Sequence, residues 1–132
     1  MSDWLALPDD PLRAATLVGL AAFFAFTGVM HFVRPSMFEA IVPPSLPAPG
    51  TLVSISGVAE LLGAFGLLIG STRVLAAWGL LALLVAVFPA NVFMARHAER
   101  FRRIAPAWAL WARLPLQPAL MAVVAWAAGL IG

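Results

Sequence analysis

Four long apolar runs constrain the fold of this chain more than any other feature of its sequence. They contain 18 to 21 residues each and cover residues 14–33, 51–69, 74–94 and 114–131. A helix rises about 1.5 Å per residue, so roughly 20 residues cross the roughly 30 Å of hydrocarbon in a bilayer. The sequence therefore predicts an all-α integral membrane protein, a bundle of four transmembrane helices in a single domain over residues 1–132.

The composition excludes a water-soluble enzyme and a disordered tail. Apolar residues make up 63% of the chain and charged residues 11%, compared with roughly 45–50% and 25% in an ordinary soluble domain. A soluble protein of this size needs polar residues to cover its large surface. The lipid bilayer is therefore the first partner that we expect.

All eight basic residues are arginines, and their distribution predicts the orientation of the chain in the membrane. Four spans place residues 34–50 and 95–113 on one side, with six arginines, and the two ends and the turn at 70–73 on the other, with two. Because cytoplasmic loops carry the excess of arginine, both termini are expected outside and the arginine-rich loops in the cytoplasm, in a bacterial plasma membrane. The cluster is interpreted as a topology signal, so no nucleic-acid partner is expected.

A short interfacial helix is predicted between the first two spans. Residues 36–39 (Ser-Met-Phe-Glu) have the pattern of a capping box, with Ser36 as the N-cap and Glu39 at the third helical position. This predicts a helix of one or two turns over residues 37–42. Its apolar residues would either face the membrane or plug the end of the bundle; they are Phe38, Ile41 and Val42.

The fourth run has a less regular beginning. Residues 105–112 are apolar but short, and we expect them to lie along the membrane surface before the last span. The last span would then hold Pro115 and Pro118 near its start, where a helix tolerates proline best.

Polar residues at membrane depth are the candidates for function. Glu60 lies near the centre of the second run, where an ionised acid costs about 2.5–3.5 kcal/mol unless it is neutral or paired. The same helix face carries Ser56, Gly57, Gly63 and Ala64, small residues that allow neighbouring helices to approach closely. We therefore expect Glu60 to point into the bundle.

The other three runs carry polar residues as well, mostly toward the cytoplasmic side. Pro89 is expected to free the carbonyl of residue 85 and bend the third helix, which leaves room for polar groups. One interpretation is a pocket that binds a small molecule or relays a proton. The other is a structural network in which Glu60 pairs with His31 or Arg113. The candidate pocket residues are Glu60, His31, Asn91, Arg113, Gln117, Thr27 and Ser56.

No metal site and no catalytic residue is identified. The chain has no cysteine, so thiolate ligands and disulfides are impossible within it. His31, His97 and Glu60 are the available ligands, and they lack the spacing of known metal motifs. Without a nucleophile elbow, a phosphate loop or paired carboxylates, the chain is not expected to be an enzyme on its own.

The polar motifs resemble those of the DoxX-like family of small four-helix membrane proteins. The similar segments are spread over about two-thirds of the chain, in the expected order, at residues 27–32, 38–43, 56–63, 87–95 and 113–117. It implies a subunit associated with a membrane oxidoreductase, such as a thiosulfate:quinone oxidoreductase or a quinol oxidase; other relatives are linked to oxidative-stress complexes or receptor assembly. The family motif includes His31, Glu60, Asn91, Arg113 and Gln117, with no agreed catalytic role.

Three functions follow from the sequence. The first is an accessory or ligand-binding subunit of membrane redox, for which a quinone-like molecule is the candidate ligand and a membrane oxidoreductase the partner. The second is an assembly factor whose small-residue faces pair with the helices of a client. The third is a small transporter of protons or solutes, which at this length would have to form a homo-oligomer.

Overall fold

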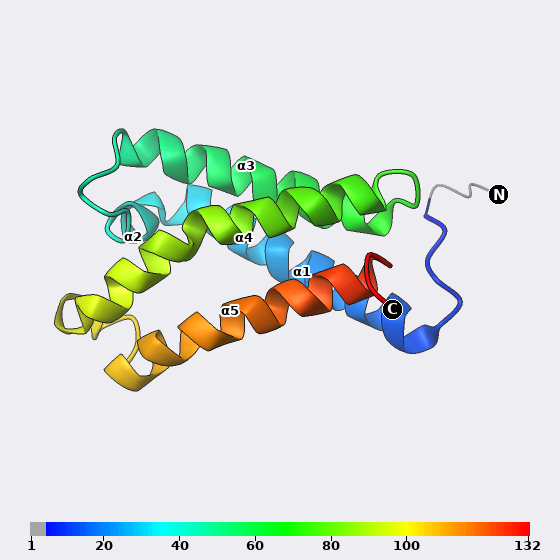
Figure 1. Cartoon of the computed structure of the whole chain (residues 1–132). Helices are drawn as coiled ribbons and strands as arrows, with labels where there is room; N and C mark the ends of the chain where they lie inside the picture. The colour runs from blue at the N-terminus through cyan, green and yellow to red at the C-terminus, as the bar shows by residue number, and fades with distance from the viewer. Residues whose placement is uncertain (1–4) are drawn as a thin grey trace.

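The computed structural model describes residues 5–132; residues 1–4 of the expected domain lie outside that range. The described residues form helices and contain no strand, which confirms the predicted all-α class (Figure 1). In chain order the helices are α1 (Pro11–Val33), α2 (Pro35–Glu39), α3 (Pro49–Leu68), α4 (Arg73–Arg96), the 3-10 helix η1 (Ala98–Phe101) and α5 (Ala107–Ala127).

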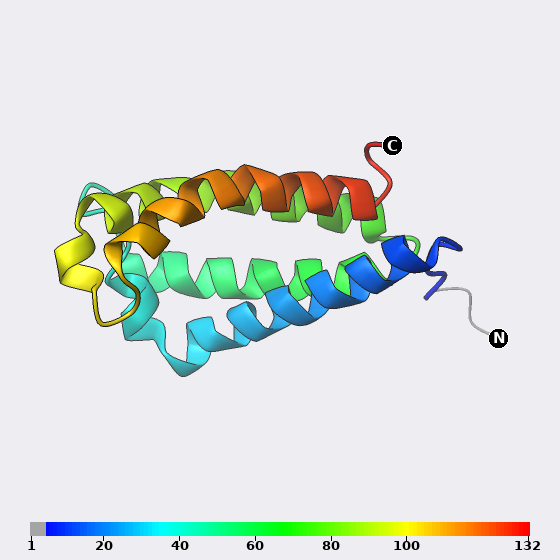
Figure 2. The same cartoon turned by 90° about the horizontal axis from the view of Figure 1, so that it is seen from below.

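The four long helices run antiparallel to their neighbours in the chain and pack in the order α1, α3, α4, α5. The fourth neighbouring pair around the bundle, α1 and α5, makes less contact than the other three neighbouring pairs. The start of α1, the turn between α3 and α4 and the end of α5 meet at one end of the bundle, which we call the closed end (Figures 1 and 2). The opposite end, which carries α2 and η1, is called the connector end.

Three of the helices, α1, α3 and α4, are long and apolar enough to cross a membrane by length and composition. α4 is the most apolar of them, yet only 17% of its apolar stretch is buried inside the protein. A helix that is apolar all round and unburied requires a nonpolar surrounding. The structure therefore agrees with a membrane protein. The predicted fourth span is not in this group, because Arg113, Gln117 and two prolines lower the hydropathy of α5.

Prolines decide where several helices begin and end. Pro11, Pro35 and Pro49 each occupy a first-turn position, where the missing N–H has no helical partner to lose. Proline also disfavours helical geometry in the residue before it. Arg34 accordingly leaves the helix, with φ −131° and ψ 61°, and separates α1 from α2.

The capping box predicted at Ser36 is wrong. The short helix covers Pro35–Glu39 rather than 37–42, its N-cap is Arg34, and no side chain caps it. The start is shifted because Pro35 fixes the backbone at the first helical position, which leaves Ser36 inside the helix.

The expectation for residues 105–112 is also wrong. Residues 107–112 are the first turns of α5, and Pro115 and Pro118 lie in its interior. Pro106 is extended, with ψ 158°, and the helix begins directly after it. Packing against α4 keeps the helix continuous, although each internal proline removes one backbone hydrogen bond.

Small residues bring α3 close to both of its neighbours, as the sequence predicts. A Cβ at Gly57 would lie 2.7 Å from the ring of Phe32 and 2.8 Å from Cβ of His31, both on α1. On the α4 side, a Cβ at Gly66 would lie 2.6 Å from that of Ala76. The two interfaces therefore depend on the absence of a side chain at these positions.

The closed end holds a tightly packed apolar core. Leu17, Phe24, Leu67, Leu80 and Val124 are fully buried there and come from all four long helices.

Arg13 joins the first and last helices beside this core. Its Nε donates to the carbonyl oxygen of Trp126 at 2.9 Å, and its guanidinium lies 4.8 Å from the centre of the Trp126 ring. The interaction satisfies a carbonyl in the last turn of α5, where cations are favoured.

We predict that Gly57→Ala destabilises the protein, because the added methyl group forces α1 away from α3. Overpacking of this kind costs about 1–3 kcal/mol. The measurement is the free energy of unfolding in mixed detergent micelles. Gly79→Ala is the matched control, since a Cβ there meets nothing within 4 Å; it should be neutral or stabilising by up to about 1 kcal/mol. Equal stability of the two variants would show that this contact does not limit the fold.

Candidate ligand-binding cavity

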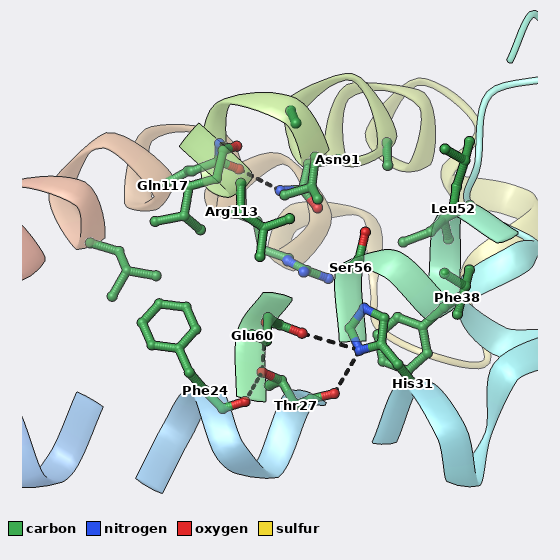
Figure 3. A pocket seen from close by; sticks show the side chains of 18 of the residues that line it. Phe24, Thr27, His31, Phe38, Leu52, Ser56, Glu60, Asn91, Arg113 and Gln117 are labelled. Carbon is green, nitrogen blue, oxygen red and sulfur yellow. Dashed lines mark hydrogen bonds and ion pairs between the residues drawn. The ribbon is translucent and has the colours of Figure 1, made fainter. Parts of the chain in front are cut away.

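A cavity of about 650 Å³ lies between the four long helices on the connector side of the core. Its volume is in the range of about 300–1,000 Å³ that is typical of small-molecule sites. The structure brings together all seven candidate residues named from the sequence. Thr27, His31, Ser56, Glu60, Asn91, Arg113 and Gln117 line this one cavity (Figure 3).

One polar wall is formed by α1 and α3. The Thr27 hydroxyl donates to Oε1 of Glu60 at 2.8 Å. Nδ1 of His31 lies 2.7 Å from the backbone oxygen of Thr27 and 3.1 Å from Oε2 of Glu60. Thr27 and His31 are four residues apart and so share one face of α1, and the small residues of α3 allow Glu60 to reach both.

Glu60 lies beside His31 and lines the cavity, but its Oε2 atom is enclosed (Figure 3). Although Nδ1 is within ion-pair distance of Oε2, its direction suits the Thr27 oxygen, and Oε2 has no hydrogen bond to the described residues. The second ring nitrogen of His31 points toward Ser56 (Figure 3). His31 therefore presents this nitrogen to the cavity, while the carboxylate lies against the other side of the ring.

The connector after α1 covers one end of the cavity. Phe38 stacks on the His31 ring, with 3.9 Å between ring centres and 21° between ring planes. Ile41 and Val42 line the same end. Of the two orientations left open by the sequence, these three residues adopt the one that plugs the bundle.

A second polar wall is formed by α4 and α5. Nδ2 of Asn91 donates to Oε1 of Gln117 at 2.6 Å, and Nε2 of Gln117 donates to the backbone oxygen of Leu84. Gln117 is only 6% exposed, so these bonds satisfy its amide inside the protein.

From the sequence, the backbone carbonyl of residue 85 was expected to lack a helical partner, because Pro89 lies four positions later. In the structure, the carbonyl that accepts the hydrogen bond from the Gln117 side chain is that of Leu84. Leu84 is buried on the side of α4 that packs in the bundle, whereas Val85 is exposed on the opposite side. The side chain of Gln117 can therefore reach the backbone at position 84.

Arg113 stands at the edge of the cavity without an acidic partner in the described part of the chain. The ion pairs there join His31 to Glu60 and Glu99 to Arg102. The contact recorded for Arg113 is with Sδ of Met94, at 3.9 Å. Its guanidinium points from α5 toward the Ser56 side of the cavity (Figure 3). Of the two pairings proposed for Glu60, the structure forms the one with His31.

The apolar part of the lining was missed in the sequence. It includes Phe23 on α1, Leu52 on α3 and Leu116, Leu120 and Val123 on α5. The signal was present, because Phe23 lies four residues before Thr27, and Leu120 three residues after Gln117. Helical spacing from the polar residues would have found them.

Residues 5–132 contain no group of three histidine, cysteine or acidic side chains that could hold a metal ion. His97 is exposed and does not line the cavity. Its Nδ1 lies 2.9 Å from the backbone oxygen of Phe93. Chemically, the cavity offers hydrogen-bonding side chains, the His31–Glu60 pair, the Arg113 guanidinium and an apolar surface.

We predict that Asn91 and Gln117 act as a coupled pair. Replacement of Asn91 by leucine leaves Oε1 of the buried Gln117 without its donor, and replacement of Gln117 leaves the half-buried Asn91 amide without its acceptor, each at a cost of about 1–3 kcal/mol. The double variant removes both groups, so its loss of unfolding free energy should be smaller than the sum of the two single losses. A double-mutant cycle in mixed micelles measures the difference. Additive losses would contradict the hydrogen bond between the two side chains.

No match was found among curated proteins or among solved structures. A protein-family model with the description "Domain of unknown function (DUF8561)" matches residues 20–130. This range includes all seven candidate residues and most of the helical bundle. The chain therefore belongs to the DUF8561 family.

Proposed function

We propose that this chain is a small membrane protein of the DoxX-like type that binds a lipophilic molecule with a polar head, a quinone-like ring being the candidate. It would act as an accessory subunit of membrane redox, beside an oxidoreductase partner. One observation carries the proposal: a cavity of about 650 Å³ combines an apolar surface with polar side chains on two facing walls. This combination is typical of small-molecule sites.

The polar groups suit a head that accepts hydrogen bonds. The carbonyl oxygens of a quinone are acceptors, and His31, Ser56 and Arg113 line the cavity with groups that can donate. Glu60, 3.1 Å from the His31 ring, would stabilise a positive charge on it in this apolar setting. Glu60 is thus proposed as a positioning residue, and His31 as the residue that contacts the ligand.

The small residues of α3 support an assembly factor less well than the cavity supports ligand binding. That alternative needs faces of α3 that are free to pair with the helices of a client. Gly57, Gly63 and Gly66 are buried, and their open sides already contact α1 or α4. The faces are therefore used inside the fold, which favours the ligand-binding proposal.

We propose further that α5 is the fourth span, with both termini outside and the arginine-rich connectors in the cytoplasm of a bacterium. α5 contains 21 residues, and Leu116 and Val123 on it are exposed. It runs antiparallel to α4, alongside a helix that is itself apolar enough to span. A helix of this length matches the thickness of the hydrocarbon core.

The first prediction of this proposal concerns ligand binding. Decylubiquinone should raise the thermal midpoint of the purified protein in detergent, since a ligand at about 100 times its Kd stabilises by about 2.7 kcal/mol. Glu60→Gln keeps the shape of the side chain but removes its charge, and should reduce the affinity at least tenfold. Glu99→Gln is the control, because Glu99 is exposed and does not line the cavity. No shift for the unmodified protein, or an unchanged shift for Glu60→Gln, would contradict the proposal.

The second prediction concerns topology. The chain has no cysteine, so single cysteines report their own side of the membrane. A membrane-impermeant maleimide should label Ser71→Cys and Gly132→Cys in intact cells, and Ser45→Cys and Ile104→Cys only after lysis. Labelling of Ile104→Cys and Gly132→Cys from the same side would show that α5 does not cross.

A further inference from the structure

Most of the exposed apolar lining of the cavity lies between α1 and α5. Four large apolar residues both line the cavity and are exposed: Phe23 on α1 (49%), Leu116 (61%) and Val123 (41%) on α5, and Leu46 (43%) in the connector before α3. Two exposed alanines line it as well, Ala119 on α5 and Ala86 on α4. Four of these six residues lie along the two edges of the gap between α1 and α5.

Each of the other three neighbouring pairs of long helices makes more contact than α1 and α5 do. Gly28 and Gly57 bring α1 against α3 so closely that a Cβ at Gly28 would lie 2.9 Å from Cγ of Leu61. Gly63 and Gly66 bring α3 close to α4 beside the core. Between α4 and α5, Gln117 donates a hydrogen bond to the backbone oxygen of Leu84.

The two helices meet at the closed end and separate toward the connector end. Leu17, Leu20 and Phe24 of α1 share the buried core with Val124 and Ala127 of α5, and Arg13 is bonded to Trp126. Beyond this core the two helices diverge (Figure 2). Phe38 and Ile41 cover the connector end of the cavity. The gap is therefore lateral, along the length of the helices.

The gap faces apolar surroundings. Phe26 on α1 is 66% exposed, and Leu116 on α5 is exposed beside the gap. If the long helices span the membrane, such residues contact acyl chains, so the opening leads into hydrocarbon and not into water.

We propose that the gap between α1 and α5 is a lateral portal through which the ligand enters from the bilayer, and that its apolar tail stays in this gap while its head reaches the polar walls. The inference rests on the proposed function and names the ligand class: an amphiphile with one compact polar head and one linear apolar tail. The head contacts the His31 side of the cavity. The tail contacts Phe23, Ala119 and Val123, and passes between them into the membrane.

The order of polarity along the path supports this orientation. The hydrogen-bonding groups lie on the inner walls, formed by Thr27, His31 and Glu60 on one side and by Asn91 and Gln117 on the other. The edges of the gap are apolar at Phe23 on α1 and from Leu116 to Val123 on α5, apart from the buried Gln117 amide, and Arg113 lies at the connector end of the α5 edge. If the polar head lay in the gap, it would have no hydrogen-bond partners there, which costs free energy. An apolar tail has no hydrogen bonds to lose, so the gap suits the tail.

The experiment compares a tailed and a tail-free probe on variants of the full chain in lipid nanodiscs. Decylubiquinone and its tail-free dimethoxy-methylbenzoquinone ring are titrated by calorimetry. Ala119→Trp fills the gap; Ala122→Trp is the matched control, since Ala122 is exposed on the same helix and does not line the cavity. Ala119→Trp should weaken decylubiquinone about tenfold, as expected for roughly two methylene groups that lose contact, and leave the ring within about twofold. Ala122→Trp should change neither.

Glu60→Gln distinguishes the head from the tail in the same titration. It should weaken both probes by the same factor, because it acts on the head. One outcome would overturn the portal and leave the proposed function standing. In it, the unmodified protein binds both probes, and Ala119→Trp lowers the affinity for both equally or for neither. A Glu60→Gln variant that weakens only the tailed probe also overturns the assignment of head and tail. If the unmodified protein binds neither probe, the proposed function fails and the portal fails with it.

Discussion

A carboxyl group in the middle of an apolar helix needs partners inside the protein, and the packing around Glu60 brings two polar side chains to it. Hydrocarbon offers no hydrogen bonds, so its partners must come from a neighbouring helix. From α1, Thr27 donates a hydrogen bond to Oε1, and the His31 ring lies 3.1 Å from Oε2. They can do so because Gly57 allows α1 to approach α3 until a Cβ would no longer fit. The helix pair with the most extensive contact is thus the pair that holds the buried acid.

The same constraint divides the bundle into two unlike halves. At the closed end, leucine, phenylalanine and alanine side chains from all four long helices fill the interior. On the connector side, polar side chains occupy the facing walls, and apolar packing cannot continue across them. The cavity is located where this change occurs, between Glu60 with its partners and the Asn91–Gln117 pair. Its position therefore follows from where the sequence places polar residues within the spans.

Much of this arrangement could be predicted from the sequence because it depends on local patterns. Hydropathy located α1, α3 and α4 within about three residues at each end, although α5 begins well before the expected residue 114. The small residues that share a helix face with Glu60 indicated that it points into the bundle. The start of α2 could not be predicted from Ser36, because Pro35 decides the backbone there. The continuation of α5 through Pro115 and Pro118 accompanies its packing against α4, which no window of residues contains. The open side of the cavity is a property of three dimensions: it requires knowing that α1 and α5 are the pair that does not close.

The open side is compatible with stability only in a membrane. In water, a gap lined by Phe23, Leu116 and Val123 would expose a continuous apolar surface, and closing it would bury area worth about 25 cal/mol per Å². In a bilayer that gain is absent, because acyl chains already surround these residues. Two features then hold α1 and α5 together: the contact of Arg13 with Trp126, and the buried apolar core that the two helices share beside it. α1 and α5 are therefore held together at the closed end and stay apart toward the connector end. In a bilayer no gain in buried apolar area drives this gap to close.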